Sequence, residues 1–262
     1  MVSDLMVILG SGNVSWHLAK QFSEVGNKSI QIYGRKIADN IYFKNFQNVE
    51  YISDLNKINR DAQIYFICVN DDSILQILNE IPFNLNNTQI MAHTSGNASS
   101  EILKADCINY GCFWPVQTLK RAVPVYSNEM PVIITGSNDF TKISLLKEAE
   151  LISNHFEIID DGLKSKLHLS AVIVNNFTNH IYSLAAEYCH SEDINFSILL
   201  SLIKETALKV EYNIPAKTQT GPAIRKDNNT INMQIKMLEN YSILSNLYSI
   251  FTNSIQLKHN SK

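Results

Sequence analysis

The sequence predicts an α/β protein: a doubly wound, mostly parallel sheet followed by an all-α domain. Three observations predict it. An apolar run near the start breaks at two glycines, short apolar runs then alternate with helical patterns up to about residue 160, and long helical patterns follow. Parallel strands need crossover connections, so the alternation is typical of a parallel sheet. We expect an α/β domain over residues 1–160 and a helical domain over residues 161–262.

The first strand runs into a glycine-rich turn. An apolar run leads to Gly10 and Gly12, and helical spacing begins at Asn13 and Val14. Strand, tight turn and helix in this order form the dinucleotide-binding crossover of a Rossmann fold. Gly10 permits the sharp turn, Gly12 lets the backbone approach a pyrophosphate, and the start of the helix attracts the anion. The third position of the motif is Ser15 rather than glycine, and an incidental turn is the alternative.

Further apolar runs predict the other strands of the sheet. They cover residues 29–33, 64–69, 89–92, 132–136 and 156–159, with a helix over residues 140–154 between the last two. The run over 64–69 is continuous, which is typical of a strand that is buried on both faces. From residue 163 onward the patterns are helical, apart from a loop over residues 215–229.

Two cations follow the second predicted strand, at Gly34-Arg35-Lys36. This position meets the adenosine ribose in a dinucleotide fold, and an acidic residue there would repel a 2′-phosphate. Arginine instead grips a phosphate with two parallel hydrogen bonds. The sequence therefore favours NADP(H) over NAD(H), the alternative being that both cations are simply solvated.

Polar residues follow two other buried strands. Val69 and Asn70 come after one of them, and His93, Thr94 and Ser95 after the next. Ligands bind at the carboxyl ends of strands in an open α/β sheet. We expect these residues beside the cofactor, with His93 as an acid, a base or a substrate anchor. The alternative for His93 is a structural role at the strand end.

Two further segments each have two interpretations. Residues 114–118 form an aromatic–proline turn that either walls a pocket, with Gln117 as a polar contact, or is structural. Thr220 lies in the loop of the helical half. It is either a substrate contact in a closing loop or part of a helix cap, with Pro222 in the first turn.

A stripe of uncharged polar residues marks the helical domain. Projected at about 100° per residue, His168, Asn175, Asn176, Asn179 and His180 share one sector, opposite an apolar one. A solvated helix face normally carries lysine and glutamate, and asparagine is a poor helix former. The stripe predicts hydrogen-bonding groups that line a cleft. Burial against another helix is the alternative.

Composition limits the class of protein. The chain has 262 residues and a formal net charge of −3, which argues against nucleic acid or an anionic membrane as the main partner. Its four cysteines show no metal-type spacing, so we expect no metal site and a reduced, cytoplasmic location.

Several motifs together resemble a bacterial family of Rossmann-like proteins with a C-terminal domain of unknown function (DUF2520), often labelled NADP oxidoreductases. They are residues 10–14 (GSGNV), 16–19 (WHLA), 93–96 (HTSG), 114–118 (WPVQT), 175–180 (NNFTNH) and 219–222 (QTGP). The glycine turn is also similar to that of pyrroline-5-carboxylate reductases and deazaflavin-dependent NADP reductases. The resemblance implies a helical domain like that of 6-phosphogluconate dehydrogenase and a homodimer formed through it.

These observations together predict an NADP(H)-dependent oxidoreductase that acts on a small carbonyl or imine. His168 or His93 would move the proton, Asn175 and Asn176 would hold the carbonyl oxygen, and the nicotinamide would lie in a cleft between residues 93–95 and the polar stripe. Related hydroxyacid dehydrogenases place a lysine four positions before an asparagine, and that lysine is absent here. No residue requires a deazaflavin. The alternative is a non-catalytic NADP(H)-binding sensor or partner-binding protein on the same scaffold.

Overall fold

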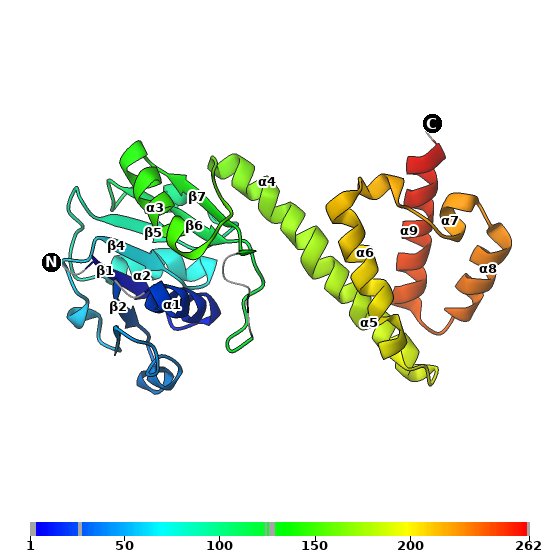
Figure 1. Cartoon of the computed structure of the whole chain (residues 1–262), viewed down its shortest axis with the longest axis horizontal. Helices are drawn as coiled ribbons and strands as arrows, with labels where there is room; N and C mark the ends of the chain where they lie inside the picture. Colours follow the sequence, from blue (N-terminus) through cyan, green and yellow to red (C-terminus); the bar gives the residue numbers. More distant parts are fainter. Residues whose placement is uncertain (1–3, 26–27, 124, 126–128, 261–262) are drawn as a thin grey trace. The chain divides into compact units, whose positions relative to one another are not determined.

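The computed structural model describes residues 4–25, 28–123, 125 and 129–260, and the chain divides into two compact units (Figure 1). The first unit is Met1–Val172 and the second is Ile173–Lys262. The first unit holds an eight-stranded sheet in the order β3-β2-β1-β4-β5-β6-β7-β8. Its neighbouring strands pair in parallel, except that β6 and β7 pair antiparallel. The predicted fold class, a Rossmann-like sheet followed by helices, is confirmed.

Six of the strands match the predicted runs, and two were missed. The strands are β1 (Asp4–Leu9), β2 (Lys28–Tyr33), β3 (Val49–Ile52), β4 (Ile64–Ile67), β5 (Ile90–His93), β6 (Tyr110–Pro115), β7 (Val132–Gly136) and β8 (Phe156–Ile158). The missed strands are β3 and β6. The aromatic–proline turn expected from residue 114 is wrong at its start, because Trp114 and Pro115 pair with Ile133 and Val132 as the last residues of β6.

Helices cover both faces of the sheet. The period of two along a strand sends Met6 and Ile8 to one face and Val7 and Leu9 to the other. The first face packs against α1 (Asn13–Val25) and α3 (Asp139–Ile152), and Phe22 of α1 stacks on the sheet. The second face packs against α2 (Ile74–Glu80) and the 3₁₀ turn η4 (Ser100–Leu103). Both apolar layers are therefore removed from water, which is the main stabilising term of such a fold.

The helix α4 (Asp161–Ala171) ends the first unit, and Asp160 caps it by accepting a hydrogen bond from the Leu163 amide at 2.8 Å. A π-helical turn (Val172–Phe177) follows directly, and α5 (Thr178–Ser191) continues from it. The boundary between the two compact units falls within this turn, between residues 172 and 173. The strands end before this boundary, and the continuous helical part of the chain begins at residue 161. The division into a cofactor domain over 1–160 and a substrate and dimerisation domain over 161–262 stays a prediction.

The π-helical turn corrects the projection used for the polar stripe. A π-turn holds more residues than an α-turn, so 100° per residue does not apply across residues 172–177. Val174 and Phe177, two apolar residues of this turn, are both exposed. The exposed segment thus carries apolar and polar side chains together.

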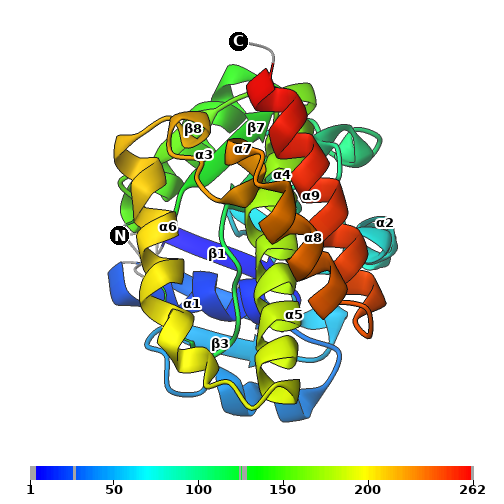
Figure 2. The ribbon, with the colours of Figure 1, turned by 90° about the vertical axis from the view of Figure 1, so that its right-hand side faces the viewer.

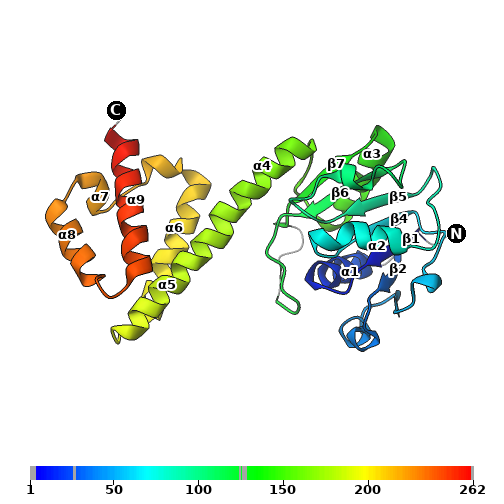
Figure 3. The same ribbon diagram turned by 180° about the vertical axis from the view of Figure 1, so that it is seen from behind.

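The second unit consists of helices. Besides α5 they are η7 (Phe196–Leu199), α6 (Leu200–Tyr212), η8 (Pro215–Lys217), α7 (Pro222–Arg225), α8 (Asn228–Met237) and α9 (Ser242–Asn260) (Figure 2). Figure 3 shows α7 and α8 beside α9, against which both pack. The loop expected over 215–229 contains η8 and α7, and Gly221 stands at the start of α7 with Pro222 in its first turn, as the cap interpretation required. Among the described residues, no helix combines the length and the hydropathy that crossing a bilayer requires.

Candidate functional site

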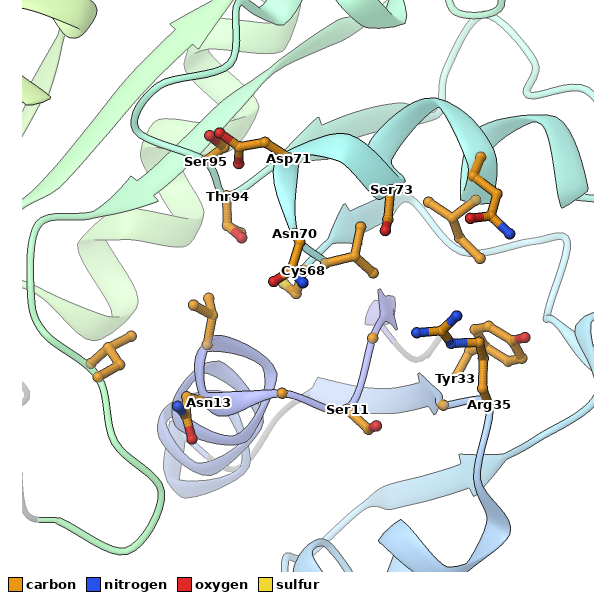
Figure 4. A pocket seen from close by; sticks show the side chains of 18 of the residues that line it. Ser11, Asn13, Tyr33, Arg35, Cys68, Asn70, Asp71, Ser73, Thr94 and Ser95 are labelled. Carbon is orange, nitrogen blue, oxygen red and sulfur yellow. The ribbon is translucent and has the colours of Figure 1, made fainter.

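A cleft of about 900 Å³ opens at the carboxyl ends of β1, β2, β4 and β5 (Figure 4). The chain winds outward from β1 toward β3 in one direction and from β4 toward β8 in the other. The cleft thus lies at the point where the strand order reverses, which is where open α/β sheets bind their ligands. The predicted residues that line it are Gly10, Gly12, Asn13, Val14, Gly34, Arg35, Lys36, Val69, Asn70, Thr94, Ser95, Gln117 and His168.

The turn between β1 and α1 has the geometry that a close-approaching ligand needs. Gly10 has a φ of +130°, and a Cβ there would lie 2.3 Å from the carbonyl oxygen of Cys68. A Cβ on Gly12 would meet nothing within 4 Å, so this glycine faces open space. The first hydrogen bond of the helix runs from the Trp16 amide to the Gly12 carbonyl at 3.0 Å, and the first turn holds no acidic residue. The start of α1 can therefore receive an anion.

Arg121 does not line the cleft but forms hydrogen bonds that hold this turn in place. Its Nη2 donates to the Ser11 carbonyl at 2.8 Å, and its backbone amide donates to the Asn13 side chain at 3.1 Å. The guanidinium also lies 3.6 Å from the ring centroid of Tyr42, a cation–π contact. Arg121 was not predicted from the sequence, because nothing along the chain links residue 121 to the glycine turn.

The end of β2 presents two cations and one carboxylate to the cleft. Arg35 and Lys36 are exposed, and among the described residues neither side chain forms an ion pair. Asp39 also lines the cleft and accepts a hydrogen bond from the Ser11 hydroxyl at 2.7 Å. Asp39 was not predicted, because the motif points to the residues directly after the strand and Asp39 lies several positions further on. In Figure 4, Arg35 lies at one end of the cleft and Thr94 and Ser95 lie at the other.

The loop after β5 forms that other end. The Thr94 amide donates to the Ile67 carbonyl at 3.1 Å and extends the sheet pairing by one residue. The Ser95 hydroxyl oxygen accepts hydrogen bonds from the amides of Asn97 and Ala98, at 3.1 and 2.9 Å. The hydroxyl hydrogen of Ser95 is then available as a donor.

His93 belongs to β5 itself and does not face the cleft. Its side chain has no exposed surface, and its Nδ1 accepts a hydrogen bond from the Ser95 amide at 3.2 Å. Burial, and next the nearby Lys164 ammonium, lower the pKa of His93 to about 4. A neutral, enclosed imidazole suits the structural interpretation. Proton transfer by His93 stays a prediction that this geometry does not favour.

His168 is the predicted histidine that lines the cleft. It lies on α4, its ring centroid is 5.5 Å from that of Trp114, and a Cβ on Gly96 would lie 2.5 Å from its Cδ2. The absence of a side chain on Gly96 therefore lets α4 approach the loop. His168 thus brings an imidazole, a group that can donate or accept a proton, to the lining of the cleft.

The same helix carries a buried lysine that was not predicted from the sequence. Lys164 has no exposed surface, and its Nζ lies 3.5 Å from Asp161 Oδ1. Burial raises the pKa of Asp161, but hydrogen bonds from Ser100 and Ser99 and the charge of Lys164 outweigh it, so that the pKa is lowered. Asp161 is thus a carboxylate at neutral pH.

The remaining predicted residues belong to the second unit, and every residue that lines the cleft belongs to the first. Asn175 and Asn176 lie in the π-helical turn, Asn179 and His180 in the first turn of α5, and Thr220 just before α7. All five are exposed. Their contact with a substrate stays a prediction. No group of three or more possible metal ligands gathers among the described residues.

Comparisons with known proteins identify the family. Residues 130–255 match the family described as "Domain of unknown function (DUF2520)". A crystal structure described as a "putative NADP oxidoreductase" from Bacteroides fragilis is 32% identical, with a TM-score of 0.89, over 97% of this chain and 98% of that chain. The chain therefore belongs to the DUF2520 family. No curated protein matches it.

More distant structures share the fold. A variant of an imine reductase from Myxococcus stipitatus, in complex with NAD⁺, is 12% identical over 99% of this chain and 96% of its own, with a TM-score of 0.66. A reductive aminase from Aspergillus terreus, in complex with NADPH and ethyl levulinate, is 14% identical over 96% of this chain and 88% of its own, with a TM-score of 0.65. The resemblance to pyrroline-5-carboxylate reductases and to deazaflavin-dependent reductases stays a prediction.

Proposed function

We propose that this protein is an NADP(H)-dependent oxidoreductase that transfers a hydride to or from a small carbonyl or imine. The observation that carries the proposal is the cleft, which combines an open Gly12 at the start of α1 with Arg35 and Lys36 at the end of β2. The relative from Bacteroides fragilis and the two reductases with bound nicotinamide cofactors support it.

The residues of the cleft fit the parts of such a cofactor. The pyrophosphate would lie over Gly12 and Asn13, where a Cβ on Gly12 would otherwise stand and the helix start favours an anion. The 2′-phosphate would pair with Arg35 and Lys36. Asp39 lines the same cleft and accepts a hydrogen bond from the Ser11 hydroxyl, and the two exposed cations, which outnumber this carboxylate, are the partners for a phosphate.

The chemistry divides between the cofactor and the chain. The bound cofactor supplies or accepts the hydride. His168 would hold or move the proton at the edge of the cleft, and Thr94 and Ser95 would orient the nicotinamide. Asn175, Asn176, Asn179, His180, Gln117 and Thr220 remain the candidates for substrate contact, since amide groups hold a carbonyl oxygen well.

The test compares cofactors by calorimetric titration. NADPH is expected to bind at least about ten-fold more tightly than NADH, because an arginine–phosphate pair contributes about 1.5–3 kcal/mol. Arg35→Glu should erase this difference, whereas Lys44→Glu, the same charge change at an exposed residue outside the cleft lining, should preserve it. Equal affinity of the unaltered protein for the two cofactors would refute the NADP(H) assignment.

Activity is tested separately, by loss of NADPH absorbance with a panel of keto acids, aldehydes and imines. Turnover that falls on His168→Phe while NADPH affinity stays within about two-fold would support the proton role of His168. Tight NADPH binding with no turnover on any member of the panel, together with a specific protein partner, would favour the non-catalytic sensor instead.

A further inference from the structure

Lys164 is a fully buried cation for which the proposed function has no use. Its Nζ donates to the carbonyl oxygens of Ser95 at 3.3 Å, of Gly96 at 3.4 Å, and of Ala98, in addition to its ion pair with Asp161. An ammonium has three donors and is costly to bury unless it is paired. The groups that compensate for burying the Lys164 charge are mainly backbone carbonyls of one short loop, residues 95–98.

The same loop forms one wall of the cleft on its other side. Ser95, Gly96 and Asn97 line the cleft, while Lys164 does not. The amides of Asn97 and Ala98 donate to the Ser95 hydroxyl, and three of the four carbonyls of the loop accept from Lys164. Because both sets of backbone groups are fixed, the face that the loop presents to the cleft is fixed as well.

Asp161, which lies on α4 with Lys164, binds the residues that directly follow the loop. It accepts hydrogen bonds from the Ser100 amide at 2.8 Å, the Ser100 hydroxyl at 2.6 Å and the Ser99 hydroxyl at 3.0 Å. Asp161, Lys164 and His168 lie three and four residues apart, and so on one face of α4. The contacts that hold the loop therefore also set where His168 meets the cleft.

The position of the loop along the cleft indicates which half of a dinucleotide it would meet. The loop follows β5, and the cations Arg35 and Lys36 follow β2, three strand spacings away in the order β2-β1-β4-β5. Three spacings amount to about 14 Å. If the cations hold the phosphorylated ribose, the loop lies at the nicotinamide end.

We infer that Lys164 is a positioning residue, which fixes the 95–98 loop and His168 so that they form the nicotinamide end of the cleft. The inference rests on the proposed function. The competing explanation is that Lys164 only stabilises the packing of α4 on the sheet.

The experiment separates the contribution of the nicotinamide half of the cofactor to binding affinity from that of the adenosine half. NADPH and 2′,5′-ADP, which lacks the nicotinamide half, are titrated into the unaltered protein, into Lys164→Met and into Lys166→Met. The last is a matched control, because Lys166 is an exposed lysine on the same helix. We expect Lys164→Met to weaken NADPH binding about ten-fold while 2′,5′-ADP binding changes by less than about two-fold. The control should change neither.

Each other outcome overturns the inference. An equal loss for both ligands would mean that Lys164 is merely structural, and no loss for either would mean that the loop does not meet the nicotinamide half. If the unaltered protein binds neither ligand, the proposed function itself fails and takes this inference with it. Should Lys164→Met not fold, Gly96→Ala is measured in its place, since its Cβ would meet His168 and Trp114 at 2.5–2.6 Å and displace the loop. The same selective loss of NADPH is expected.

Discussion

His93 lies at the end of β5 with no exposed surface, and its pKa is lowered to about 4. Burial is the main cause, and the Lys164 ammonium adds to it, while the carboxylates of Asp161 and Asp71 act in the opposite direction. The imidazole is thus neutral in the folded protein at pH 5 to 7. An unfolded chain releases it to water, where its pKa is about 6.5.

This difference makes stability depend on pH. Between pH 6.5 and pH 4 the unfolded state binds a proton at His93 that the folded state does not, so stability falls as pH falls through this window. From pH 7 to pH 5 the loss due to His93 should be about 2 kcal/mol. Urea unfolding at the two pH values measures it in the unaltered protein and in His93→Gln. The His93→Gln variant should lose about 2 kcal/mol less, and an identical loss in both proteins would contradict the lowered pKa.

At the scale of an element, the turn between β1 and α1 contains two glycines with different reasons to be glycine. A Cβ on Gly10 would collide with the backbone of Cys68, directly after β4, and a residue other than glycine would have to adopt a positive φ there. A Cβ on Gly12 would enter open space on the ligand side. One glycine is required by the fold, and the other is required by the ligand that we propose.

The two alanine variants should therefore separate stability from binding. Gly10→Ala is expected to destabilise the protein by about 2–4 kcal/mol, since both a clash and a strained backbone result. Gly12→Ala should leave stability within about 1 kcal/mol and still weaken NADPH binding at least about ten-fold. Thermal unfolding and calorimetric titration of both variants measure this. Normal NADPH binding by Gly12→Ala would mean that the pyrophosphate does not approach this residue.

The elements also show what the sequence could and could not predict. Local patterns were sufficient for the glycine turn and for six strands, since apolar residues mark each strand even where a polar residue interrupts it, as Gln31 does in β2 and Glu157 in β8. The strand β3 was missed because it has four residues with Glu50 among them, and β6 because Gly111 and Pro115 normally interrupt strands. The π-helical turn has no signal in side-chain type.

Lys164 illustrates the limit for the site. A lysine on a helix is normally solvated, and its burial here depends on carbonyls of residues 95–98, which the chain brings to it only in the folded structure. Most of the predicted residues that line the cleft follow strand ends, where topology alone fixes their place, whereas His168 lies on α4.

At the scale of the whole molecule, the second unit exposes an unusual amount of apolar surface. On α9, Ile243, Ile250 and Leu257 are 61%, 60% and 71% exposed. They are spaced seven residues apart, which places them on one stripe of the helix. Large apolar side chains that are exposed at regular spacing along one helix favour an interaction site. We propose that it contacts the helical unit of a second copy, in agreement with the homodimer expected from the sequence.

The dimer can be tested by introducing a charge into the stripe. Ile250→Glu should convert the dimer into a monomer, because an unpaired carboxylate in an apolar interface costs several kcal/mol. A cost of this size raises the dissociation constant of the dimer more than about 1,000-fold. Ile108→Glu is the matched control, since Ile108 is 68% exposed in the first unit. Light scattering, measured as each protein elutes from a size-exclusion column, gives the mass of each variant. The unaltered protein and the control should be dimers, and their melting temperatures should rise with protein concentration. The melting temperature of Ile250→Glu should not depend on protein concentration. A monomeric unaltered protein would show that the stripe does not join two copies.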